Sequence, residues 1–160
     1  MAVEQAALRI APAESEAELD LARRLFREYI DGLGVDLSFQ DVESELGSLP
    51  GRFAPPAGVI LLATRAGAGL GCGAMRPLGI GVCEMKRLYV RREARGEQLG
   101  RRLAEALMRY AANAGYRCMR LDTLASMESA QSLYASLGFR EIAPYTENPL
   151  PGTKFLECVL

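Results

Sequence analysis

The chain has 160 residues, a length that suits one domain with a sizeable core and is too short for two domains of ordinary size. Its 19 basic and 20 acidic residues nearly cancel, so the total charge gives no indication of a nucleic-acid partner. Histidine is absent, which removes the commonest metal ligand and excludes Ser-His and Cys-His nucleophile pairs, and with them the hydrolase triads.

The first third of the chain predicts one short strand and two helices. Residues 8–11 indicate the strand. Ser15 and Glu18 form a capping box for a helix whose apolar side chains share one face. That face comprises Leu21, Leu25, Phe26, Tyr29 and Leu33. After a glycine-containing break at residues 31–35, Ser38 is predicted to cap a second helix with Val42, Leu46 and Leu49 on one face.

The middle of the chain predicts an antiparallel meander. A turn-rich connector at residues 50–58 is followed by three segments with the character of strands, at residues 59–65, 70–77 and 82–90. The first two of these flank a turn at residues 66–69.

The last third of the chain predicts a long helix and then a mixture of strands and one helix. Apolar residues recur at helical spacing from Leu99, and Gly115 stands where a left-handed C-terminal cap is needed. Strands are expected at residues 118–122, 139–142 and 154–160, and a helix at residues 128–137. The order predicts an α+β fold, with a mixed, mostly antiparallel sheet of about six to seven strands and about four flanking helices. We expect residues 1–160 to form a single domain.

The turn before Leu99 is rich in arginine and contains glycine. No Ser, Thr, Asp or Asn precedes Leu99 closely, so the first amides of the helix lack the usual side-chain acceptor. An anion suits this position, because free N–H groups and the positive end of the helix dipole converge there. We therefore predict a phosphate site; its spacing matches neither the dinucleotide-binding motif nor the P-loop. The alternative is a solvated basic helix start, with Gly96 and Gly100 as ordinary turn residues.

Two motifs resemble those of the GNAT N-acetyltransferase superfamily. The first is the run Arg-Gly-Glu-Gln-Leu-Gly at residues 95–100, preceded by the apolar strand end Leu-Tyr-Val, which is similar to the coenzyme A loop of that family. The second is the run at residues 121–142, in which a strand is followed by a helix with Ala130 and Tyr134 and then by Gly138 and Phe139. The resemblance extends over nearly the whole chain.

The first motif departs from the family pattern at Gln98, which stands where the loop usually has its first glycine. A non-glycine residue at positive φ costs on the order of 1 kcal/mol or more. Either the loop has a different shape at Gln98, or the amide of that residue is not used.

The resemblance implies where acetyl coenzyme A binds. The strand that ends at Val90 splays from the strand that begins near Cys118, and the acyl chain of the coenzyme enters between them. The backbone of Leu88, Tyr89 and Val90 then pairs with the pantetheine arm as an added strand does. The pyrophosphate is expected on the turn, at the residues Arg95, Gly96, Gln98, Leu99, Gly100 and Arg101. No metal is implied.

The resemblance also assigns two proton-transfer roles. Glu84 matches the position of a general base that removes a proton from the amine, directly or through water, and Tyr134 matches the tyrosine that protonates the departing thiolate. The alternatives are a solvent-facing strand carboxylate for Glu84 and a helical aromatic packed beside Leu133 and Leu137 for Tyr134.

The residues that bind the acceptor amine are less clearly indicated by the sequence. Candidate acceptor contacts are Tyr29 on the first helix and Tyr145 and Asn148 on the proline-rich loop at residues 144–152. The first helices are acidic, and in the family such helices commonly wall the acceptor side, so charge complementarity points to a cationic amine. For the helices, an ordinary solvated face is the alternative. For the loop, the alternative is that its prolines simply fix a chain crossing before the last strand.

The predicted function is transfer of an acetyl group from acetyl coenzyme A to a primary amine of a small molecule or peptide. A non-catalytic acyl coenzyme A binding module of the same fold is the alternative. We expect no nucleic-acid or membrane partner, and the sequence leaves a homodimer open.

Cysteine usage and the lack of membrane-spanning character indicate a cytoplasmic protein. The four cysteines form no CxxC pair and lie among apolar residues, which favours reduced, buried thiols over two disulfides. No segment has the length and uniform apolarity of a membrane span, and the N-terminus lacks a basic region followed by a long apolar stretch.

Overall fold

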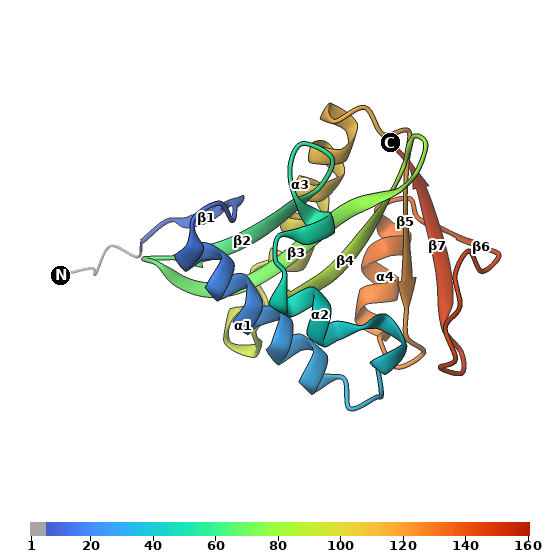
Figure 1. Ribbon diagram of the computed structural model, residues 1–160, viewed down its shortest axis with the longest axis horizontal. Helices are drawn as coiled ribbons and strands as arrows, with labels where there is room; N and C mark the ends of the chain where they lie inside the picture. The colour runs from blue at the N-terminus through green and yellow to red at the C-terminus, as the bar shows by residue number, and fades with distance from the viewer. Residues whose placement is uncertain (1–5) are drawn as a thin grey trace.

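The computed structural model describes residues 6–160, and its elements follow the predicted order (Figure 1). The N-terminal half contains β1 (Leu8–Pro12), α1 (Glu16–Gly32), α2 (Val42–Gly47), β2 (Val59–Arg65), β3 (Ala68–Gly79) and β4 (Val82–Val90). The C-terminal half contains α3 (Leu99–Asn113), β5 (Cys118–Thr123), α4 (Glu128–Ser136), β6 (Arg140–Ile142) and β7 (Lys154–Val159). Single turns of 3-10 helix lie at Ser38–Gln40, Gly51–Phe53 and Arg92–Ala94. The predicted α+β class is confirmed.

Within residues 6–160 the strands form one seven-stranded sheet in the order β1-β2-β3-β4-β5-β7-β6. All neighbours are antiparallel except β4 and β5, which are parallel. These two strands pair only where Val82, Cys83 and Glu84 lie opposite Cys118, Met119 and Arg120. Beyond that point they diverge, so the predicted splay in the middle of the sheet is confirmed (Figure 1).

The sheet separates two apolar cores, because successive side chains of a strand point to opposite faces. On β2, Ile60 and Leu62 pack with Leu25 and Phe26 of α1, whereas Leu61 packs in the other core, with α3. Figure 1 shows α1 and α2 on one face of the sheet and α3 and α4 on the other. Burying each large apolar side chain contributes about 1.5–3 kcal/mol, so the two cores fix the helices on the sheet.

Two predicted helix caps are confirmed. The Ser15 hydroxyl accepts a hydrogen bond from the Glu18 amide at 3.1 Å, and the Glu18 carboxylate accepts one from the Ser15 amide at 3.0 Å. At the end of α3, Gly115 has a φ of +95°, and the Tyr116 amide donates to the Ala111 carbonyl at 3.0 Å. These contacts satisfy helix-end groups that would otherwise lack partners.

The predicted cap at Ser38 is wrong. Ser38 begins a turn of 3-10 helix, and its backbone N–H donates to the Asp36 carboxylate at 2.8 Å. The α2 helix starts only after Asp41, whose φ is +52° and whose side chain forms no cap. The Asp36 side chain thus closes a local turn in competition with the helix start that the sequence pattern suggested.

The cysteine prediction agrees with the structure. Cys72, Cys83, Cys118 and Cys158 are all free thiols, and three of them are buried. Among the residues that the structure describes, no helix has both the length and the apolarity needed to cross a membrane.

Candidate active site

The C-terminal part of β4 has an open edge on the side that faces β5. Residues 85–90 have no partner on the β5 side within the described chain. The pairing with β3 shifts register between Cys72 and Ala74, and Arg87 has a φ of +60°, which marks a bulge in β4. The bulge bends β4 where it leaves β5. The backbone of the following residues, Leu88, Tyr89 and Val90, is therefore placed to accept an added extended chain.

A buried ion pair holds this bulge. The Arg87 guanidinium donates to both carboxylate oxygens of Glu45 on α2, at 2.9 and 3.2 Å. The two side chains are only 3% and 13% exposed. The Arg87 carbonyl also accepts a hydrogen bond from the Cys72 thiol at 3.3 Å. These contacts offset the cost of a non-glycine residue at positive φ.

The predicted phosphate turn has the expected uncapped geometry. In residues 6–160, no backbone or side-chain oxygen accepts a hydrogen bond from the amides of residues 96–101. Gln98 is the N-cap of α3, but its side chain does not cap the helix. Leu99 is 2% exposed and anchors the first turn of the helix. The free amides therefore face outward beside the exposed Arg95, with Arg101 half-buried against Ser136.

Backbone strain at Gln98 predicts a stabilising substitution. Gln98 has a φ of +54°, which costs an L-residue about 1 kcal/mol or more. Gln98→Gly should raise the free energy of unfolding by roughly 0.5 kcal/mol, because relief of the strain exceeds the added chain entropy of glycine. The urea midpoint should rise at an unchanged slope. Gln98→Ala keeps the strain and serves as the control. A midpoint for Gln98→Gly at or below that of Gln98→Ala would contradict the assignment.

Glu84 is buried at the point where β4 and β5 separate. Its side chain is 3% exposed, so the alternative of a solvent-facing carboxylate is wrong. Arg76 Nε donates to Glu84 Oε1 at 3.0 Å, and Arg76 Nη2 forms an ion pair with the same oxygen at a distance of 2.9 Å. The Tyr145 hydroxyl donates to Glu84 Oε2 at 2.7 Å. Both carboxylate oxygens of Glu84 are thus engaged, and any proton that reaches them must pass through Tyr145 or water.

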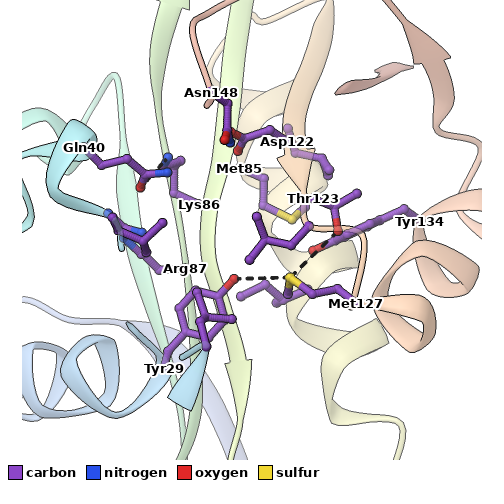
Figure 2. Close-up of a pocket in the computed structure, with 15 residues that line it drawn as sticks. Tyr29, Gln40, Met85, Lys86, Arg87, Asp122, Thr123, Met127, Tyr134 and Asn148 are labelled. Atoms are coloured by element: carbon purple, nitrogen blue, oxygen red, sulfur yellow. Dashed lines mark hydrogen bonds between the residues drawn. The ribbon is translucent and has the colours of Figure 1, made fainter. Parts of the chain in front are cut away.

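Tyr134 lies at a narrow cavity of about 40 Å³ between β4 and β5 (Figure 2). Its ring packs edge-on against Phe139, with centroids 5.6 Å apart. In Figure 2 its hydroxyl points into the cavity, towards Thr123 and Met127. Burial raises the pKa of Tyr134, so its phenol stays protonated at neutral pH. Tyr134 is therefore a packed aromatic whose protonated hydroxyl lies at the cavity.

The three predicted acceptor contacts do not all lie together. Tyr29 lines the narrow cavity, its hydroxyl lies 4.0 Å from Met127 Sδ, and burial raises the pKa of Tyr29 to about 12. Asn148 lines the same cavity and donates to Asp122 Oδ2 at 3.1 Å. Tyr145 does not line the cavity. Its hydroxyl is directed to Glu84, and its ring packs edge-on against Phe155.

A wider cavity of about 280 Å³ adjoins the narrow one. The two cavities share Gln40, Lys86, Arg87 and Asp122 as lining residues. Lys86 Nζ donates to Gln40 Oε1 at 3.4 Å, and burial lowers the pKa of Lys86. Lys86 and Asp122 were not predicted from the sequence. One signal in the sequence could have indicated Lys86. Side chains alternate between the two faces of a strand, so Lys86 and Glu84 lie on the same face of β4.

The acidic residues of α1 do not form the wall of either cavity. Glu28 accepts hydrogen bonds from Arg91 and from the Tyr89 hydroxyl, and the Arg91 contact lowers the pKa of Glu28. Arg27 of α1 pairs with Glu43 of α2 in the same way. These contacts agree with an ordinary solvated helix face for α1. On α2, Glu45 lines the wider cavity, where it is paired with Arg87. A cationic acceptor stays a prediction.

No metal site is evident in the part of the chain that the structure describes. Within residues 6–160, no group of three or more His, Cys, Asp or Glu side chains is arranged to hold a metal ion.

Comparison with known proteins identifies the family. The family model of the acetyltransferase (GNAT) domain matches residues 56–141, more than half of the chain. An uncharacterized N-acetyltransferase of Schizosaccharomyces pombe is 41% identical over 149 residues, which cover 92% of this chain and 91% of that protein. The chain therefore belongs to the GNAT acetyltransferase family.

Solved structures share the fold over nearly the full length. A GCN5-related N-acetyltransferase from Kribbella flavida has 25% identity and a TM-score of 0.72, with 96% of this chain and 98% of that chain covered. PaiA N-acetyltransferase from Thermoplasma acidophilum, solved in complex with coenzyme A, has 16% identity and a TM-score of 0.73, with coverages of 96% and 99%.

Proposed function

We propose that the protein transfers an acetyl group from acetyl coenzyme A to a primary amine of a small molecule or peptide. The observation that carries the proposal is that the open β4 edge at residues 85–90 is followed closely in the chain by the free amides of residues 96–101. An extended pantetheine arm pairs with Leu88, Tyr89 and Val90, and its pyrophosphate lies on the turn. The thioester end then lies at the narrow cavity beside Tyr134. Solved relatives that carry coenzyme A or acetyl coenzyme A support this choice of donor.

The reaction is a direct attack of the amine nitrogen on the thioester carbonyl carbon. A carbon–nitrogen bond forms, the carbon–sulfur bond breaks, the amine loses a proton and the thiolate gains one. Tyr134 supplies the proton to the thiolate. An alkylammonium has a pKa near ~10.4 and must be deprotonated before it attacks. Glu84 is the candidate base and receives that proton through the Tyr145 hydroxyl or through water, because its own oxygens are already engaged.

A non-catalytic acyl coenzyme A binding module is the second candidate. The strained Gln98 in the phosphate turn favours it, because a turn optimised for the coenzyme would carry glycine at a left-handed position. The two candidates share the coenzyme site and differ in whether thiol is released.

Coenzyme binding is tested by thermal unfolding with acetyl coenzyme A. At one hundred times the dissociation constant the ligand adds about 2.7 kcal/mol, which raises Tm by roughly 5–10 °C for a chain of this size. Gly100→Glu should abolish the shift, because it places a carboxylate beside the pyrophosphate. Gly100→Ala is the matched control: a Cβ there would lie 3.6 Å from Leu133 Cδ2 and 3.9 Å from Val90 Cγ2, which are ordinary contacts. No shift in the unmodified protein at millimolar ligand would refute the proposal.

A further inference from the structure

Four of the charged residues that line the wider cavity form two ion pairs. Arg76 is paired with Glu84, and Arg87 with Glu45, each at 2.9 Å. Arg52 and Glu147 are exposed at the rim, and Arg52 donates to the Pro77 carbonyl at 3.1 Å. The remaining charged lining residues are Lys86 on β4 and Asp122 on β5.

Lys86 has a neutral partner only. Within residues 6–160 no carboxylate oxygen lies within salt-bridge distance of Lys86 Nζ, and the Gln40 amide oxygen accepts its hydrogen bond at 3.4 Å. The charges that face Lys86 are Glu84 and Asp122, which favour its ammonium form, and Arg87 and Arg76, which oppose it. A half-buried ammonium without an anion is costly, and a ligand carboxylate would remove much of that cost.

Asp122 lies on the other side of the same space. Its carboxylate accepts a hydrogen bond from Asn148, and it lines the narrow cavity together with Tyr134. Figure 2 shows Lys86 with Gln40 at one side of the cavity and Asp122 with Asn148 at another. An amino group held at Asp122 is thus close to the proposed proton donor, while a carboxylate held at Lys86 is close to the wider cavity.

We propose that the acceptor is an amino acid, whose carboxylate pairs with Lys86 and whose amino group lies at Asp122. This inference rests on the proposed acetyl transfer and names the chemical class of its acceptor. The rest of the acceptor extends into the wider cavity, where Phe39, Leu78 and Thr146 form part of the wall. Lys86 and Asp122 act as specificity-determining residues, since each recognises one charge of a zwitterion.

The test compares acceptors that differ only in the carboxylate. Thiol release from acetyl coenzyme A is measured for each of the common amino acids, for its carboxamide and for the amine that lacks the carboxyl group. At least one amino acid should have a kcat/KM roughly 30-fold or more above those of its two analogues, the usual size of the loss when one partner of a buried charge pair is removed.

Lys86→Met assigns this preference to one side chain. Methionine keeps much of the apolar stem of lysine and removes its charge. The variant should raise KM for the preferred amino acid by the same factor and leave kcat/KM for the decarboxylated amine unchanged. Lys154→Met is the matched control, because Lys154 is the other lysine of the chain and is exposed at the start of β7. An unchanged thermal shift with acetyl coenzyme A verifies that Lys86→Met is folded.

The outcomes separate the two proposals. Equal kcat/KM for amino acids and their carboxamides would overturn the amino-acid inference and leave acetyl transfer standing. A carboxylate preference that persists in Lys86→Met would remove Lys86 as its source. If no amine of any class gave thiol release, despite a clear thermal shift with acetyl coenzyme A, both proposals would be overturned and the binding module would be favoured.

Discussion

Tyr134→Phe should lower kcat by roughly a hundredfold or more, while the thermal shift with acetyl coenzyme A stays nearly unchanged. The substitution keeps the ring that packs against Phe139 and removes only the hydroxyl that points into the cavity. Steady-state thiol release measures the effect. Tyr110→Phe is the control, because Tyr110 lies on α3 with 41% of its surface exposed. Equal turnover of Tyr134→Phe and the unmodified protein would assign Tyr134 to packing alone.

The pH dependence of kcat follows from the environment of Tyr134. Burial disfavours the phenolate, so the pKa of Tyr134 is raised above the ordinary tyrosine value of about 10. The Tyr134 phenol therefore stays protonated and neutral from neutral pH to about pH 10. If Tyr134 is the proton donor that we propose, kcat should not fall in this range. A falling limb below pH 10 that disappears in Tyr134→Phe would contradict this environment.

Glu45→Gln should be strongly destabilising, by about 3 kcal/mol, because it leaves the Arg87 guanidinium buried without its counter-charge. The lost pair also fixes the β4 bulge, so the variant should bind coenzyme more weakly as well. Urea unfolding measures the first effect, and the thermal shift with acetyl coenzyme A measures the second.

The matched control lies on the same helix. Glu43 also pairs with an arginine, Arg27, but the two side chains are 80% and 41% exposed. Exposed pairs contribute little, so Glu43→Gln should have a urea midpoint indistinguishable from that of the unmodified protein. A similar small effect for Glu45→Gln would show that the Arg87 pair does not stabilise the bulge.

The parts of the fold that local signals specify were predictable from the sequence. The strands at residues 59–65 and 82–90 have the predicted bounds, because apolar runs between turn residues mark both ends. The end of α3 was predictable because Gly115 meets a backbone requirement of the cap. The uncapped start of α3 was predictable for a similar reason, since capping depends on a few neighbouring residues.

The parts that depend on contacts between distant segments were not predictable. The bulge at Arg87 arises from register with β3 and from the pair with Glu45, and neither leaves a periodic signal. Ser38 carries the right residue type for a cap, but the turn closed by Asp36 displaces the helix start. Lys86 and Asp122 line one cavity only because β4 and β5 diverge beside them. Their shared cavity could therefore be recognised only from the tertiary structure.

The most direct test of acetyl transfer measures both products of one reaction. The protein is incubated with acetyl coenzyme A and a mixture of amino acids, amines and short peptides, and free thiol and N-acetylated acceptor are quantified together, the latter by mass spectrometry. Acetyl transfer requires one acetylated amine for each thiol released, and Tyr134→Phe should lower both amounts in parallel. Thiol release that does not depend on any acceptor, or acetyl coenzyme A that stays intact while bound to the protein, would contradict it.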